Sequence, residues 1–76
     1  MKAFVLISIN EGTENSFLKE LQSYEQITKA HTIFGEWDII AELEMPTLEA
    51  MSMFLTDRVR SRDNVKLTST LIVAGQ

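Results

Sequence analysis

The chain has 76 residues, enough for one domain but not for two. It contains no cysteine, which excludes disulfide bonds and cysteine-ligated zinc as sources of stability. The net charge is −4, and no stretch approaches the about 20 apolar residues of a membrane helix or has the layout of a signal peptide, so we expect a cytoplasmic protein that does not bind membranes.

A central β-strand is predicted at the start of the chain, over residues 2–10. Residues 3–9 are almost all apolar and rich in β-branched side chains. Both faces of this strand are apolar, which is typical of a strand covered on two sides.

A helix is predicted after Gly12. Thr13 is a residue type that caps helices, and apolar side chains recur behind it at helical spacing. These side chains are Phe17, Leu18, Leu21 and Tyr24. They form one stripe about three turns long, which is suited to packing on a sheet.

Two strands, over residues 27–34 and 37–45, are predicted to form a hairpin around Gly35, whose backbone freedom suits a tight turn. The odd positions of the second strand are apolar and the even ones mostly charged, so one face is core and the other partly wet. The plain interpretation puts Trp37 in the core and Asp38 in solvent. In the alternative, the carboxylate, the aromatic ring and nearby backbone amides hold a small zwitterion.

A second helix and a last strand complete the chain. Pro46 ends the hairpin strand, and Thr47 is the predicted cap of the helix. The expected apolar face of that helix consists of Leu48, Met51, Phe54, Leu55 and Val59. After a turn at residues 63–64, the strand over residues 65–74 has two sides, with Thr68, Thr70 and Ile72 on one and Leu67, Ser69, Leu71 and Val73 on the other.

The order β-α-β-β-α-β predicts an α+β fold of the ferredoxin-like kind, with a four-stranded antiparallel sheet and two helices on one face. The other face then exposes Phe4 or Val5, together with Ile40 and Ile72. Monomers rarely leave such a patch open, and a domain this small has a marginal core. We therefore predict a homodimer whose sheets face each other, of the dimeric α/β-barrel type.

Little in the sequence indicates catalysis. His31 is the only histidine and lies in mid-strand, where a structural or surface role is favoured over that of a general base. Glu42 and Glu44 share a strand face, but alternating acids are common on wet strand faces. The glycines are scattered and form no phosphate-binding loop. We predict no catalytic residue, no metal site and no cofactor.

Basic residues gather at the end of the second predicted helix. They are Arg58, Arg60, Arg62 and Lys66. Cations are favourable at a helix C-terminus, and this group is too small for the phosphate-neutralising face that nucleic-acid binding needs. We predict no direct binding of nucleic acid.

Two short motifs together resemble the ligand-binding module of the leucine-responsive regulator (Lrp/AsnC) family, also called the RAM domain. They are Gly35-x-Trp37-Asp38 at the hairpin and Val65-x-x-Thr68-x-Thr70 in the last strand. The resemblance spans essentially the whole chain, in order and spacing.

Two positions depart from the family pattern. Asn64 stands where the family usually has Gly, although Asn also tolerates left-handed turns, and Phe34 stands where a small polar residue is common. The helix-turn-helix domain that precedes the module in full regulators is not in this sequence. We expect residues 1–76 to form a single, stand-alone RAM-like domain for effector binding and oligomerisation, with no DNA-binding domain.

The resemblance implies a site for a free amino acid, typically at a contact between two dimers. One wall of that site would be the hairpin, with Gly35, Glu36, Trp37 and Asp38. Its backbone amides would meet the carboxylate of the ligand, and Asp38 its ammonium group. The side chain of the ligand would be met by Thr68 and Thr70. Dimers would associate into a larger oligomer.

The sequence therefore favours a non-enzymatic amino-acid sensor that regulates transcription indirectly through ligand-coupled oligomerisation, in association with a full-length Lrp-type regulator. One alternative is a small dimeric α+β-barrel enzyme, oxygenase-like, that uses Trp37 and His31. Another is a pure oligomerisation module. Fold alone does not decide among them.

Overall fold

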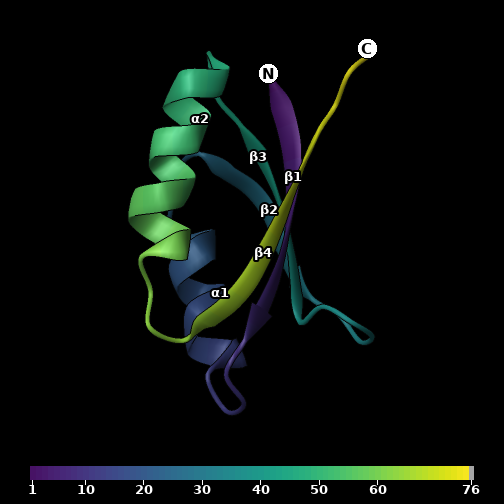
Figure 1. The fold of residues 1–76 in the computed structure, drawn as a ribbon, viewed down its shortest axis with the longest axis vertical. Coiled ribbons are helices and arrows are strands. Elements are labelled where there is room, and N and C mark those ends of the chain that lie inside the picture. The colour runs from purple at the N-terminus through teal and green to yellow at the C-terminus, as the bar shows by residue number, and fades with distance from the viewer. Residues whose placement is uncertain (76) are drawn as a thin grey trace.

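One four-stranded antiparallel sheet organises the computed structural model, which describes residues 1–75. The strand order is β2-β3-β1-β4, with β1 (Lys2–Ile9), β2 (Ile27–Thr32), β3 (Ile39–Glu44) and β4 (Val65–Ile72). Helix α1 (Glu14–Gln22) follows β1, and α2 (Leu48–Leu55) follows β3 and continues as a π-helical segment, η1 (Thr56–Arg60). Both helices lie on the same face of the sheet (Figure 1), which confirms the predicted ferredoxin-like arrangement and the central position of β1.

The core lies between this sheet face and the helices. Every second residue of β1 is buried, and the same alternation on β3 buries Ile39, Ala41 and Leu43. The helices add Phe17, Leu21, Met51, Phe54, Leu55 and Val59. The predicted stripes are confirmed except at Leu48, which is 53% exposed. Helical side chains lean back over the preceding turn, and Leu48 begins its helix, so it has no such turn to cover.

The two predicted helix caps differ. The Thr47 side chain accepts a hydrogen bond from the Ala50 N–H at 3.1 Å, as expected for a cap. Thr13 occupies the capping position of α1, but no side chain caps that helix. Its hydroxyl instead donates to the Asn10 carbonyl at 2.8 Å and accepts from the Asn64 side chain at 3.2 Å. Thr13 therefore ties the loop after β1 to the turn before β4.

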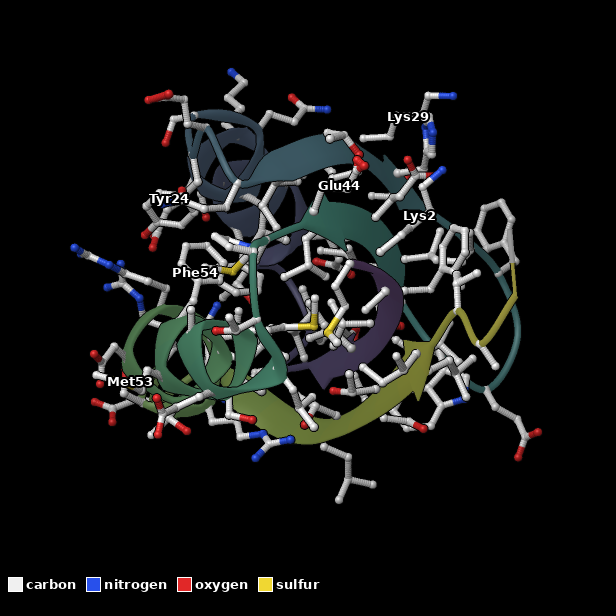
Figure 2. The ribbon with its side chains drawn as sticks, turned by 90° about the horizontal axis from the view of Figure 1, so that it is seen from above. Lys2, Tyr24, Lys29, Glu44, Met53 and Phe54 are labelled. Atoms are coloured by element: carbon white, nitrogen blue, oxygen red, sulfur yellow. The ribbon has the colours of Figure 1, made fainter. Side chains whose placement is uncertain are left out.

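The other side of the sheet, here called the open face, is partly apolar. Its apolar members are Phe4, Leu6, Ile40, Leu67 and Leu71. Charged side chains lie beside them, and Figure 2 shows Lys2 and Lys29 on the side of the sheet opposite α2. The predicted open apolar face is confirmed. Of the two alternatives for β1, Phe4 lies on this face and Val5 is buried in the core. The expected position of Ile72 is wrong, because Ile72 pairs with Ala3 on the helix side.

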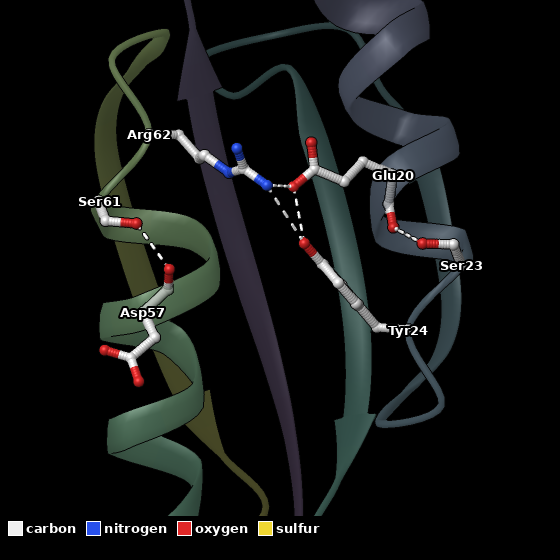
Figure 3. Close-up of polar contacts among 6 residues, drawn as sticks. All are labelled: Glu20, Ser23, Tyr24, Asp57, Ser61 and Arg62. Carbon is white, nitrogen blue, oxygen red and sulfur yellow. Dashed lines mark hydrogen bonds and ion pairs between the residues drawn. The ribbon is translucent and has the colours of Figure 1, made fainter.

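A polar cluster joins the two helical segments (Figure 3). The Tyr24 hydroxyl donates to Glu20 at 2.7 Å, and the Arg62 guanidinium pairs with the same carboxylate. The hydrogen bond to Tyr24, together with Glu20, raises the pKa of Arg62. Arg58 lies over the Tyr24 ring, which meets Phe54 edge-on at 5.5 Å between centroids. These two arginines therefore have partners within the fold.

Candidate functional site

The hairpin between β2 and β3 is longer than the sequence indicates. Strand β2 ends at Thr32 and β3 begins at Ile39, so the connection spans residues 33–38 and protrudes beyond the sheet (Figure 1). The prediction that the second strand starts at Trp37 is wrong. Gly35 has φ +132°, which explains the need for glycine, and the Ile33 N–H donates to the Asp38 carbonyl at 2.9 Å to close the loop.

The side chains of this hairpin differ in exposure. Phe34, next to Gly35, is fully exposed, and Glu36 is exposed as well. Trp37 is half-buried, so it is neither a core residue nor a free surface ring. The plain interpretation of Trp37 as core is therefore wrong.

Asp38 is tied to the end of β1. Its Oδ2 accepts the Ile9 N–H at 2.9 Å, and its own N–H donates to the Ile7 carbonyl at 2.9 Å. Within residues 1–75, its Oδ1 has no hydrogen-bond partner. The carboxylate is thus held in a fixed position by one oxygen, and the other is available to a ligand.

A cavity of about 360 Å³ lies where the hairpin meets the N-terminal end of α1. Its lining residues are Glu14, Asn15, Thr32, Ile33, Phe34 and Asp38. Asp38 is the one predicted site residue among them. The residues from α1 were missed by sequence reasoning, although the topology contains a signal for them. Because β1 and β3 are antiparallel neighbours, the helix that follows β1 starts beside the loop that precedes β3.

The two threonines of β4 lie elsewhere. Thr68 pairs with Ile7 and Thr70 with Val5, so both are on the helix side of the sheet. The Thr68 hydroxyl accepts from Arg60 Nε at 3.3 Å, whereas Thr70 Oγ1 is buried without a partner. Neither threonine lines the cavity at the hairpin, so one chain does not bring the two predicted halves of the site together there.

The enzyme alternative finds little geometric support. A cavity of about 140 Å³ on the open face is lined by Phe4, Lys29, His31, Ile40 and Glu42, and a second of about 250 Å³ follows β2 and also includes His31. Trp37 lines neither of them. Among residues 1–75, no group of three or more acidic, histidine or cysteine side chains is placed to hold a metal ion, and no helix there could cross a membrane.

Comparison with known sequences gives a match along nearly the whole chain. The family model of the Lrp/AsnC ligand binding domain matches residues 2–76. The HTH-type transcriptional regulator FL11 of Pyrococcus abyssi (strain GE5 / Orsay) is 30% identical over 73 residues, which cover 96% of this chain and 48% of that protein. The chain therefore spans about half the length of this curated relative.

Solved structures share the fold. The hypothetical protein PHS023 from Pyrococcus horikoshii superposes with a TM-score of 0.91 at 28% identity, over 99% of this chain and 90% of that one. The transcriptional regulator NMB0573 in complex with L-Met, from Neisseria meningitidis, superposes with a TM-score of 0.89 at 19% identity. That match covers 99% of this chain and 50% of the regulator, and at this identity it shows the fold alone.

Proposed function

We propose that this chain, which belongs to the Lrp/AsnC ligand binding domain family, is a non-enzymatic amino-acid sensor that regulates transcription through ligand-coupled assembly. The family match carries the regulatory, ligand-binding role. The cavity beside Asp38 supports a small ligand at the hairpin. That the Neisseria meningitidis regulator was solved with L-Met supports an amino acid as that ligand.

The proposed ligand contacts are those that the hairpin motif implies. We propose that Asp38 Oδ1, which has no partner among residues 1–75, accepts from the ammonium group of the ligand. The backbone N–H groups of Gly35, Glu36 and Trp37, which belong to the same hairpin but do not line the cavity, would donate to its carboxylate. Thr68 and Thr70 do not line this cavity in their own chain. We infer that Thr68 reaches a ligand only from a neighbouring copy, so that the complete site needs more than one chain. The Thr70 hydroxyl is buried in its own chain and takes part only if its side chain turns outward.

The open face is the proposed dimer contact, with sheet against sheet. Its apolar side chains include Leu67 and Leu71, which are 66% and 53% exposed. Covering such a patch removes apolar surface from water. Dimers would then meet through their hairpins to form a larger oligomer. A ligand bound only by the assembled form stabilises that form, which couples amino-acid level to assembly.

The regulatory output is proposed to pass through a partner. The chain spans about half the length of FL11, an HTH-type transcriptional regulator. We propose that residues 1–76 act as one effector-binding domain and co-assemble with a full-length Lrp-type regulator, which supplies the DNA contacts. A pull-down with such a regulator checks this: mixed oligomers are expected, and their absence would remove this route.

A thermal-shift screen against the free amino acids tests the sensor function, with molar mass by light scattering for each hit. A ligand at about 100 times its Kd adds roughly 2.7 kcal/mol. For a domain of this size that raises Tm by about 10 °C or more. A selective shift with a change in mass is expected. No shift with any amino acid would favour the pure oligomerisation module instead.

Replacing Asp38 by asparagine is expected to weaken ligand binding without unfolding the domain. The amide oxygen of Asn can still accept the Ile9 N–H, but the charge that meets the ligand ammonium is lost. Loss of a charge-assisted contact costs about 1.5–3 kcal/mol, or roughly ten- to a hundredfold in Kd. Calorimetric titration measures this. The exposed Asp57→Asn change on η1 is the matched control, and an unchanged Kd in Asp38→Asn would move the site elsewhere.

A further inference from the structure

One aromatic ring at the hairpin is not covered by its own chain. Phe34 is 104% exposed, whereas Leu67, the next most exposed large apolar side chain among the described residues, is 66% exposed. The loop that carries the ring is closed by the hydrogen bond from Ile33 to Asp38 and depends on the positive φ of Gly35. Single exposed apolar side chains are common on protein surfaces, so the position of this ring in the fold decides what it can do.

The hairpin, residues 33–38, lies on the side of the sheet that faces away from the helices. In Figure 1 it extends to the right of the strands while both helices lie to the left, and the view from above in Figure 2 agrees. The open face looks outward on this same side. A second copy that packs its sheet on the open face therefore meets the hairpin. In a two-fold dimer this contact occurs twice, because each chain presents the same surfaces to the other.

The open face carries a cavity of about 140 Å³ that one aromatic ring can fill. Its walls come from β1, β2 and β3, and its lining residues are Phe4, Lys29, His31, Ile40 and Glu42. An apolar cavity of about 150 Å³ in a protein core holds benzene, so the volume suits a phenyl ring. Phe34 does not line this cavity in its own chain, so a ring that fills it must come from another copy.

The charged residues of this cavity do not oppose a ring. The Glu42 carboxylate accepts from the Thr28 hydroxyl at 2.9 Å and pairs with Lys2 at 3.8 Å, so its charge has partners within the sheet. The Lys29 stem can pack along a ring while its ammonium group stays in water or lies over the ring face. The cavity is thus suited to an aromatic side chain.

We propose that Phe34 anchors the dimer by inserting into the open-face cavity of a second copy, against that copy's Phe4 and Ile40, while its own cavity receives the second copy's Phe34. This inference rests on the proposed sheet-against-sheet dimer and adds to it a contact between the hairpin of one chain and the face of the other. Phe34 also lines the cavity at the hairpin, so dimer formation fixes one wall of the proposed ligand site.

A Phe34→Ala variant tests the anchor, with the dimer Kd measured by analytical ultracentrifugation without added amino acid. Burying one phenylalanine side chain changes an equilibrium constant about tenfold or more, and each dimer buries two. The dimer Kd is therefore expected to rise at least about a hundredfold. Met53→Ala, at an exposed apolar residue on the outer side of α2, is the matched control and should leave the Kd unchanged. An unchanged Kd in Phe34→Ala would overturn the inference.

A double-mutant cycle with Ile40→Ala assigns the ring to the cavity. Residues in contact have effects that do not add, whereas separate residues have effects that do. In the Ile40→Ala background, Phe34→Ala is expected to raise the dimer Kd by a factor at least about threefold smaller than in the unmodified protein. Leu71→Ala, on the open face but outside the cavity, is the control background and should leave the effect of Phe34→Ala unchanged. Additive effects of Phe34→Ala and Ile40→Ala would place the ring elsewhere and overturn the inference.

The same measurements separate a failure of the anchor from a failure of the dimer. If Leu6→Glu, a change at the centre of the open face, disrupts the dimer and Phe34→Ala does not, the anchor is wrong but the sheet-against-sheet dimer stands. If Phe34→Ala removes only the larger oligomer and leaves the dimer intact, the ring acts between dimers and the inference is wrong. If the unmodified protein is monomeric at every concentration, the dimer fails together with its anchor.

Discussion

Replacing Leu6 by glutamate is expected to leave the protein as folded monomers. Leu6 lies on the open face of the central strand β1, between Ile40 of β3 and Ser69 of β4. In the proposed dimer, the new carboxylate would be buried against the apolar side chains of a second sheet, and an unpaired buried charge costs several kcal/mol. A loss of about 3 kcal/mol raises the dimer Kd at least about a hundredfold. Analytical ultracentrifugation over a range of protein concentrations measures this dimer Kd.

The matched control is Met53→Glu on the outer side of α2. Met53 is 62% exposed and points away from the sheet (Figure 2), so the same change of chemistry is made outside the proposed interface. The molar mass of the Met53→Glu assembly in solution should equal that of the unmodified protein. A dimer of normal strength in Leu6→Glu would show that the open face is not the contact. If Met53→Glu is monomeric while Leu6→Glu remains a dimer, the dimer contact lies on the helices instead of the open face.

The Leu6→Glu variant also addresses the threonines. If Thr68 and Thr70 reach the ligand from another copy, a monomer keeps the cavity at the hairpin but loses half of the complete site. Its affinity for an amino acid should then fall although no residue of the cavity has been changed. This would separate a site within one chain from a site shared between chains.

Strand faces and the core could be predicted from the sequence because side chains alternate with period two. The split of the last strand into Thr68, Thr70 and Ile72 on one side and Leu67 and Leu71 on the other is the one the register shows. What that pattern cannot give is which side the helices cover. Ile72 was therefore expected on the open face, whereas its pairing with Ala3 puts it on the helix side.

The candidate site was harder to predict because its contacts link distant parts of the chain. Gly35 indicates a turn, and the turn is present. Asp38 at the end of the connection accepts the Ile9 N–H, a contact between residues 29 apart that no local pattern contains. The sequence predicts both Thr13 and Thr47 as helix caps, yet the Thr13 hydroxyl forms hydrogen bonds with Asn10 and Asn64 instead. That Glu14 lines the cavity likewise becomes visible only when the start of α1 is placed beside the hairpin.

Replacing Leu21 by alanine is expected to destabilise the domain strongly. Leu21 is 0% exposed and lies on the face of α1 that packs on the sheet. Removing a buried leucine side chain costs about 2–5 kcal/mol, because the transfer energy is lost and a cavity remains. Natural domains are stable by about 5–15 kcal/mol, so Tm should fall by about 10 °C or more. Leu48→Ala, at 53% exposure, is the matched control and should change little.

Urea unfolding of Leu21→Ala and Leu6→Glu at several protein concentrations separates the two sources of stability. A core defect lowers the free energy of unfolding by the same amount at every concentration. Loss of the dimer instead removes the part of the stability that rises with concentration, since only the folded chain associates. The free energy of unfolding of Leu6→Glu should therefore equal that of the unmodified protein in dilute solution and be lower than it at high protein concentration. If the unmodified protein shows no concentration dependence at all, its stability comes from the core alone and the open face is not a dimer contact.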